Sequence, residues 1–281
     1  MKTKGKIAVV APASRLTPET ADKVTALARR LYGSAVPEIF FHPQCFLSAG
    51  HFAGSDAERS AAFLDVANDG AYGAVWFARG GYGSCRLEDR VFSNLNKNAR
   101  QKTYLGYSDM GNLLARLYAV GAGQPVHGPM PQDINRSGGD AAIARALAWL
   151  VEGDRQSLEP AAQSSQKVAA FNLTILSHLI GTPWQPDLSD HIIMVEEVSE
   201  YHYRIDRAFF TVTSNENIRR AAGIMLGRCS DIPENEVAFG ADEEAICRYW
   251  CQRSGIPYLG RADIGHDAGN RVVPFGGFLT A

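Results

Sequence analysis

Residues 102–120 read Lys-Thr-Tyr-Leu-Gly-Tyr-Ser-Asp-Met-Gly-Asn-Leu-Leu-Ala-Arg-Leu-Tyr-Ala-Val, a short apolar run that passes directly into a helical pattern. The run at 104–107 is typical of a buried strand, and apolar residues then recur at helical spacing, at Met110, Leu113, Leu114 and Leu117. Ser108 lies at the break. As a helix N-cap it would satisfy backbone N–H groups that lack a partner, and as a nucleophile it would react where those groups stabilise negative charge. The stretch by itself favours the cap.

The alternation of apolar strand and amphipathic helix runs through the first half of the chain. A helix is predicted to open at Thr17, and another at Ser55, where Glu58 completes a capping signal. Strands are predicted at 7–12, 39–42, 74–78 and 104–107, and a strand with a loop is predicted at 125–130. Later in the chain, strands are predicted at 191–198 and 223–226. This order is typical of an α/β layer with a mainly parallel sheet.

Composition excludes several classes of protein. The 281 residues are 46% hydrophobic and 21% charged, as in an ordinary globular protein, and the net charge of −2 gives no reason to expect nucleic acid or an anionic membrane as a partner. No apolar run approaches the roughly 20 residues that span a bilayer. The apolar stretch at 7–11 is too short for a signal peptide, and five cysteines are too few and odd in number for a disulfide scaffold. We therefore expect a cytoplasmic protein.

A glycine-rich stretch, Arg79-Gly-Gly-Tyr-Gly-Ser84, follows the third predicted strand. Open α/β sheets bind ligands at this edge, where strands end. The stretch matches neither the phosphate loop nor the dinucleotide fingerprint, so we expect no cofactor. Three glycines in four residues indicate positive φ angles or a close backbone approach, which a ligand-binding loop and a plain turn explain equally well.

A catalytic serine would need a base from another part of the chain. His266, in a glycine-bounded loop, is a candidate because the pKa of histidine lies near neutrality. Glu196 or Glu197, after an apolar run, is a candidate for the acid that orients it, and side-chain alternation along a strand allows one of the two to face a shared site. The alternative is that all three lie in solvent. The histidines and cysteines lack metal-ligand spacing, so no metal site is expected.

Together these stretches resemble the LD-carboxypeptidase family, the muramoyltetrapeptide carboxypeptidases, whose relatives include the microcin C immunity peptidases. The matches occur in one order along nearly the whole chain. They are Ile7–Ser14, Arg79–Ser84, Gly106–Asp109, His127–Met130, Leu173–Pro183, Val195–Val198, Tyr203–Arg207, Gly265–His266 and Pro274–Gly276.

The resemblance implies a serine peptidase in which Ser108 is the nucleophile, His266 the general base and acid, and Glu196 the residue that orients His266. It implies an oxyanion hole formed by the backbone N–H groups of Gly81 and Asp109. It also implies a homodimer, and a reaction that releases terminal D-alanine from a murein tetrapeptide during peptidoglycan recycling.

Arg79 is a candidate partner for the terminal carboxylate of that substrate, because arginine binds carboxylates through two hydrogen bonds. A structural ion pair is the alternative role for Arg79. One residue departs from the family pattern: Phe171 stands where a glycine is usual, which puts the fit of the substrate in doubt. Two other functions stay open, an amidase of the microcin-immunity kind acting on peptidyl-nucleotides and a non-catalytic α/β ligand-binding protein.

The predicted fold class is α/β with two domains. Residues 152–167 lose the apolar period and gather Gly, Asp, Ser, Gln and Pro, so we expect a linker at 156–167. A Rossmann-like, parallel-sheet domain at 1–155 would carry the nucleophile and the glycine loop. A smaller α/β domain with a mixed sheet at 168–281 would carry the Glu and His.

Overall fold

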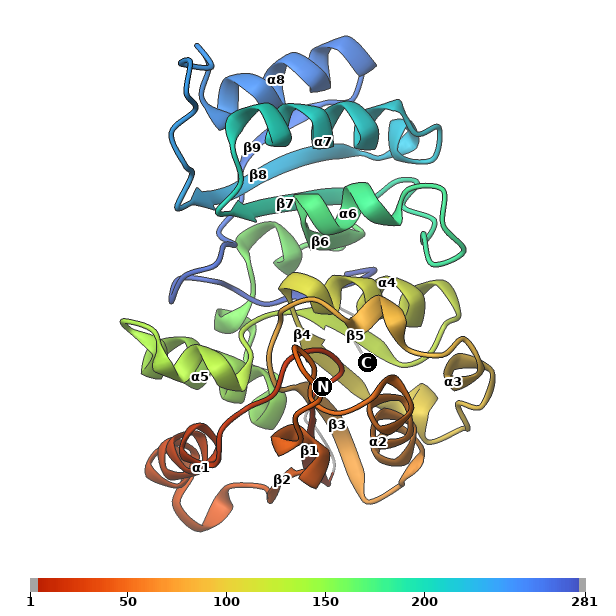
Figure 1. Cartoon of the computed structure of the whole chain (residues 1–281), viewed down its shortest axis with the longest axis vertical. Coiled ribbons are helices and arrows are strands. Elements are labelled where there is room, and N and C mark those ends of the chain that lie inside the picture. Colours follow the sequence, from red (N-terminus) through yellow and green to blue (C-terminus); the bar gives the residue numbers. More distant parts are fainter. Residues whose placement is uncertain (1–4, 278–281) are drawn as a thin grey trace.

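The computed structural model describes residues 5–277 and contains two β-sheets, each flanked by helices, stacked along the long axis of the molecule (Figure 1). The first sheet has six strands in the order β10-β5-β4-β3-β1-β2, parallel except for β10. Its strands are β1 (Lys6–Val10), β2 (Ile39–Phe41), β3 (Tyr72–Phe77), β4 (Thr103–Gly106), β5 (Gln124–His127) and β10 (Val273–Pro274). The expected Rossmann-like parallel sheet is therefore confirmed.

The second sheet has four strands in the order β6-β7-β8-β9. They are β6 (Val168–Asn172), β7 (Ile192–Val198), β8 (Gly223–Ser230) and β9 (Tyr258–Arg261), and every pair is parallel. The expected mixed sheet is wrong in this detail, because a crossover helix follows each of the first three strands and returns the chain to the same end. The antiparallel strand is instead β10, which the chain reaches without a helix and which pairs with β5. The division into domains at 156–167 stays a prediction.

Helices cover both sheets. Those of the first half are α1 (Pro18–Tyr32), α2 (Asp56–Asn68), α3 (Arg90–Ser93), α4 (Gly111–Ala119) and α5 (Gly139–Leu147). Those of the second half are α6 (Leu173–Leu179), α7 (His202–Ser214) and α8 (Glu243–Ser254). Local signals set two of the starts as predicted: Thr17 caps α1, and Ser55 with Glu58 forms a capping box on α2.

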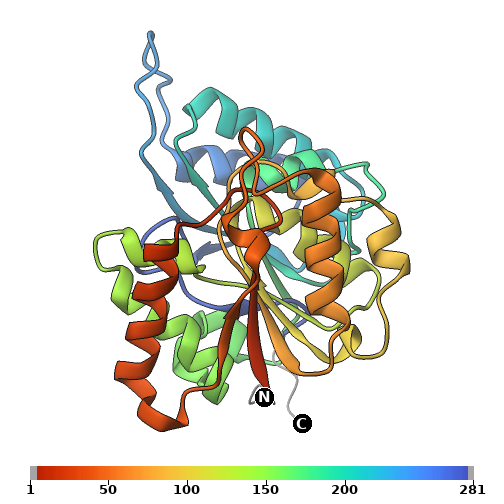
Figure 2. The same ribbon diagram turned by 60° about the horizontal axis from the view of Figure 1, so that its bottom comes forward.

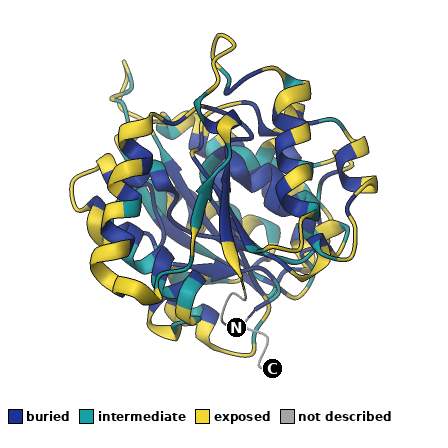
Figure 3. Ribbon diagram, turned by 90° about the horizontal axis from the view of Figure 1, so that it is seen from below, coloured by how far each residue is buried: buried dark blue, intermediate teal, exposed yellow. Residues whose placement is uncertain are grey.

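The apolar core is continuous between the two sheets. One cluster of buried residues runs from β1 and β3 through α4 to β6, β7, α7 and α8. Helix α4 lies between the sheets, so the helix that follows Ser108 packs against both (Figure 1). A second cluster fills the opposite face of the first sheet, beneath α1 and α5. Figure 3 shows the buried strands of this sheet between helices whose outer faces are exposed.

The surface has one conspicuous projection. Figure 2 shows the segment between β8 and α8 rising clear of the rest of the chain, with Val237 81% exposed. Within residues 5–277, no helix combines the length and the apolar character that crossing a bilayer requires. The basic residues that open the chain, Lys2 and Lys4, lie outside the described part.

Candidate active site

Ser108 lies on a strained turn between β4 and α4. Its φ angle is +59°, a left-handed conformation that residues other than glycine rarely adopt. No side-chain hydrogen bond caps the helical turn that begins there, so the N-cap interpretation is wrong. The tight turn needs Gly106, because a Cβ atom there would lie 2.8 Å from the Phe77 ring. The turn instead presents the Ser108 hydroxyl to another part of the chain.

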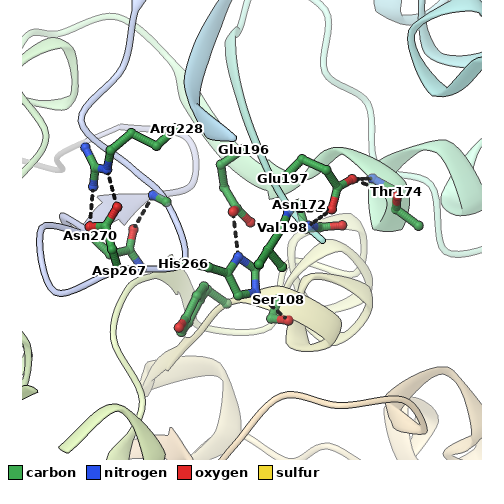
Figure 4. A network of polar contacts seen from close by, with 12 residues as sticks. Ser108, Asn172, Thr174, Glu196, Glu197, Val198, Arg228, His266, Asp267 and Asn270 are labelled. Carbon is green, nitrogen blue, oxygen red and sulfur yellow. Dashed lines mark hydrogen bonds and ion pairs between the residues drawn. The ribbon is translucent and has the colours of Figure 1, made fainter. Parts of the chain in front are cut away.

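That hydroxyl is the first member of a hydrogen-bonded series (Figure 4). His266 Nε2 lies 3.0 Å from Ser108 Oγ, and His266 Nδ1 lies 2.6 Å from Glu196 Oε2. A carboxylate only accepts, so Nδ1–H donates to Glu196 and Nε2 is left to accept the serine proton. Glu196 is fully buried and His266 is 8% exposed. The fold thus brings together all three residues that the sequence pointed to.

The charge of Glu196 controls the protonation of His266. Burial by itself lowers the pKa of His266, but the adjacent carboxylate and its hydrogen bond outweigh burial and raise the pKa above 6.5. The imidazolium form is therefore favoured by Glu196, which is the electrostatic help that a general base needs when it takes a proton.

Glu197 faces the other side of β7. Its carboxylate accepts hydrogen bonds from Asn172 Nδ2 at 2.7 Å, from Thr174 N and Oγ1 at 2.9 and 2.7 Å, and from Val198 N at 2.9 Å. Burial raises its pKa. Strand alternation therefore sends Glu196, and not Glu197, toward His266, and the pairing of β7 with β8 shifts register between Val195 and Glu197.

The loop that carries His266 is anchored on both sides. Arg228 of β8 donates to Asp267 from Nε at 2.5 Å and from Nη2 at 3.0 Å (Figure 4). Asn270 Oδ1 accepts from Gly265 N at 3.2 Å and from His127 Nε2 at 3.0 Å. Burial lowers the pKa of His127 to about 4, so this histidine is a neutral donor.

The glycine loop lies against Ser108. Gly81 has a φ angle of +85°, and its N–H donates no hydrogen bond within residues 5–277. Ser84 ties the loop to the turn, because its N–H donates to Asp109 Oδ2 at 2.8 Å and its hydroxyl to Asp109 O at 2.6 Å. The buried guanidinium of Arg59 holds the loop from behind through Gly83 O at 2.7 Å. The N–H of Asp109 is in the first helical turn, where such groups lack a helical partner.

A cavity of about 360 Å³ opens above Ser108. Arg79 lines it, is exposed, and forms no hydrogen bond or ion pair with residues 5–277, so its guanidinium is available to a ligand. Phe171 does not line the cavity. It is fully buried, with its ring centroid 5.0 Å from that of Phe275, so the substitution for glycine is accommodated in the core.

In the described part of the chain, no group of three or more His, Cys, Asp or Glu is placed to hold a metal ion.

Asp133 and Arg136 also line the cavity and were not singled out from the sequence, and Tyr107 was noted only as part of the strand and motif that lead to Ser108. Asp133 and Arg136 follow the strand β5 at the same sheet edge as Ser108, which is the signal that marks them. Nothing in the local spacing indicates that Arg136 meets His266, because that contact joins residues 130 positions apart.

Comparison with known proteins agrees with this arrangement. Residues 7–128 match the LD-carboxypeptidase N-terminal domain, and residues 167–280 match the LD-carboxypeptidase C-terminal domain. The putative carboxypeptidase slr1534 of Synechocystis sp. is 32% identical over 252 residues, which cover 85% of this chain and 79% of the relative. The murein tetrapeptide carboxypeptidase of Pseudomonas aeruginosa is 26% identical over 295 residues, covering 97% and 91% of the two chains.

Solved structures share the fold. The muramoyltetrapeptide carboxypeptidase from Oxalobacter formigenes superposes with a TM-score of 0.77 at 24% identity, covering 96% of this chain and 93% of the other. MccF in complex with glutamyl sulfamoyl guanosine gives a TM-score of 0.78 at 15% identity, covering 98% and 92%. The domain matches and the 32% identical relative span most of the sequence, and the chain therefore belongs to the LD-carboxypeptidase family.

Proposed function

We propose that this peptidase is a serine carboxypeptidase that releases terminal D-alanine from murein tetrapeptides during peptidoglycan recycling. The observation that carries the proposal is the continuous series Ser108–His266–Glu196, whose serine and histidine line a cavity, in a chain of the LD-carboxypeptidase family. The murein tetrapeptide carboxypeptidase of Pseudomonas aeruginosa, which aligns over 97% of this chain, supports the choice of substrate.

In the proposed mechanism His266 Nε2 takes the proton of Ser108 Oγ as the oxygen attacks the carbonyl carbon of the bond to D-alanine. His266 then returns the proton to the leaving amine, and a water molecule hydrolyses the acyl-enzyme in the same way. Glu196 holds the Nδ1–H tautomer and stabilises the imidazolium that forms in each step.

Backbone N–H groups supply the stabilisation of the tetrahedral intermediate. Gly81 and Asp109 lie on the two segments that meet at Ser108, and the Ser84–Asp109 hydrogen bonds hold those segments together. One donor of this kind is worth about 3 kcal/mol in the transition state. The glycines of the loop matter because a side chain at Gly81 would meet Ser14 Oγ at 2.3 Å.

Arg79 is proposed to bind the terminal carboxylate of the substrate. Its guanidinium has no partner among residues 5–277 and lines the same cavity as Ser108, so an anionic group bound there would lie close to the attacked bond. Arginine suits this role because it can donate two parallel hydrogen bonds to a carboxylate.

The decisive test replaces Ser108 with alanine and measures D-alanine released from purified murein tetrapeptide. We expect steady release by the wild type and none by Ser108→Ala. A matched control is Ser93→Ala, on the surface of α3, which should retain full activity. Wild type and Ser108→Ala that both fail to release D-alanine would contradict the hydrolase and favour a ligand-binding protein.

The alternative substrate is a peptidyl-nucleotide, which the likeness of the fold to MccF brings into consideration. Wild-type turnover of murein tetrapeptide and of an aminoacyl sulfamoyl adenosine, measured side by side, distinguishes the two. Faster cleavage of the sulfamoyl compound would overturn the choice of murein peptide.

We further propose that the enzyme acts in the cytoplasm as a homodimer. All five cysteines are unpaired, which suits a reducing compartment. Sedimentation velocity and cell fractionation test the two statements, and a monomer or a periplasmic location would contradict them.

A further inference from the structure

Asp133 and Arg136 form an ion pair beside the catalytic triad, the proposed set of Ser108, His266 and Glu196. This ion pair is not used in the proposed mechanism. Both residues line the cavity above Ser108 and lie in or just after the turn Pro131–Asn135. Asp133 is 5% exposed. A buried carboxylate is costly unless it is well hydrogen-bonded, so its partners indicate what it is there to hold.

The carboxylate of Asp133 has three partners. Oδ1 accepts from Tyr107 Oη at 2.8 Å and from Arg136 Nε at 2.9 Å, and Oδ2 accepts from Met130 N at 2.8 Å. Two of these partners lead to the triad. Tyr107 immediately precedes Ser108, and Arg136 donates from Nη1 to the carbonyl oxygen of His266.

Tyr107 also provides a surface for the imidazole. Its ring centroid lies 4.8 Å from that of His266, with the planes tilted by 54°. The same ring meets His127 edge-on at 5.6 Å. Asp133 therefore contacts the backbone of His266 through Arg136 and the ring of His266 through Tyr107.

This double attachment matters because Ser108 and His266 come from different parts of the fold. Ser108 follows β4 of the first sheet, whereas His266 lies in the loop after β9 of the second sheet. A misplacement of about 1 Å between reacting groups can cost about 100-fold in rate.

We propose that Asp133 and Arg136 are positioning residues that hold the imidazole of His266 at the correct distance and orientation relative to the Ser108 hydroxyl. Arg136 holds the main chain at His266, and Asp133 holds both Arg136 and the phenol of Tyr107. Neither residue takes part in the hydrogen bonds that join Ser108, His266 and Glu196. This inference rests on the proposed serine mechanism.

The two charges also act on His266 with opposite signs. Burial and then Glu196 dominate the pKa of His266; of the remaining charges, Arg136 lowers that pKa and Asp133 raises it. The other groups that face His266 are His127, a neutral donor, and the phenol of Tyr107, whose pKa burial raises well above its usual value. Loss of Asp133 should therefore move the acid limb of the pH profile to lower pH, and loss of Arg136 should move it to higher pH.

The experiment measures kcat and KM for D-alanine release across pH, together with the rate at which a fluorophosphonate probe labels Ser108. We expect Asp133→Asn to lower kcat by about 10- to 100-fold, with KM changed by less than about threefold and a slower labelling rate. Tyr107→Phe keeps the ring but loses the hydrogen bond, so its fall in kcat should be smaller.

Variants of Arg136 separate charge from geometry. Arg136→Lys keeps the positive charge but cannot bond both Asp133 and the His266 carbonyl, so kcat should fall while the acid limb stays in place. Arg136→Gln should lower kcat and also move the limb to higher pH. Circular dichroism identifies any variant that fails to fold, and the conservative changes Tyr107→Phe and Arg136→Lys then carry the test.

A matched pair provides the control. Arg30 and Asp140 form an ion pair at 2.5 Å whose side chains are 66% and 63% exposed. Arg30→Lys and Asp140→Asn make the same chemical changes on the surface and should leave kcat, the pH profile and probe labelling unchanged.

The possible failures are distinguishable. A wild type that neither releases D-alanine nor takes up the probe contradicts the proposed function. An active wild type whose Asp133 and Arg136 variants match it in kcat and pH profile overturns the positioning role, as does a rise in KM at constant kcat, which would show substrate binding instead.

Discussion

The two consecutive glutamates of β7 enter different regions of the molecule. Glu196 faces the loop that carries His266, where its Oε2 meets His266 and its buried Oε1 has no hydrogen-bond partner among residues 5–277. Glu197 faces α6 and accepts four hydrogen bonds from Asn172, Thr174 and Val198. Glu196 thus has a single partner, His266, whose charge changes in the proposed reaction. The hydrogen bonds of Glu197 with Asn172 and Thr174 hold β6 and α6 to β7.

The difference shows how surroundings assign roles to identical side chains. Fixed donors surround Glu197, and such hydrogen bonds stabilise structure at modest net energy. Glu196 faces His266, a residue that titrates, and the charge of Glu196 raises the pKa of His266. The contrast predicts that changes at Glu196 affect rate and changes at Glu197 affect stability.

The largest effect is expected for Glu196→Gln. The amide can hold His266 in the wrong tautomer and no longer stabilises the imidazolium, so kcat should fall by about 10³- to 10⁴-fold. D-alanine release measures the rate, and thermal unfolding checks that the fold is retained. A smaller loss of turnover here than in Glu197→Gln would show that the roles are reversed.

The pH profile tests the same region. His266 must be neutral to accept the serine proton, and Glu196 raises its pKa above 6.5. We expect kcat/KM of the wild type to fall as pH drops through a value above 6.5. In Glu196→Gln the residual activity should show this limb at lower pH, and an unshifted limb would contradict the electrostatic role of Glu196.

Glu197→Gln should act on stability. The new amide group would face a backbone N–H, leaving a buried polar group unsatisfied at a cost of about 1–3 kcal/mol, with kcat within about threefold of the wild type. Denaturant unfolding measures the free energy.

The pH dependence of that difference has a definite sign. Burial raises the pKa of Glu197 from its ordinary value of 4.5, so the stability from its protonated form is present below pH 4.5 and is lost as pH rises through the folded value. The wild type should therefore exceed Glu197→Gln by more at pH 4 than at pH 7. The opposite trend would show a carboxylate stabilised in its charged form.

The smallest effect is expected for Thr174→Val. It removes the hydrogen bond from Oγ1 to Glu197 at 2.7 Å but keeps the one from the Thr174 backbone N–H. We expect a loss of about 1 kcal/mol in the free energy of unfolding and unchanged D-alanine release. A drop in turnover would indicate that the two regions of β7 are coupled.

Much of the fold followed from local signals. The helix starts at Thr17 and Ser55 were predicted because a capping residue acts on N–H groups within its own turn. Three strands were not predicted, β6, β9 and β10. Val168–Asn172 was noticed only for its departure from the family pattern, and β10 has two residues whose strand character comes from pairing with β5.

The sequence by itself pointed to Ser108, Glu196 and His266, because the chemistry of acyl transfer and the family motifs both depend on residue type and order. Tertiary structure decided how they are used. It placed Ser108 on a strained turn that directs the hydroxyl toward His266, where the sequence favoured a helix cap. It directed Glu196 and not Glu197 toward His266, and it placed Asp133 and Arg136 beside the loop that carries His266. Capping and strand alternation act over a few residues, whereas these contacts join segments up to 158 positions apart, which only the packing of two sheets around α4 brings together.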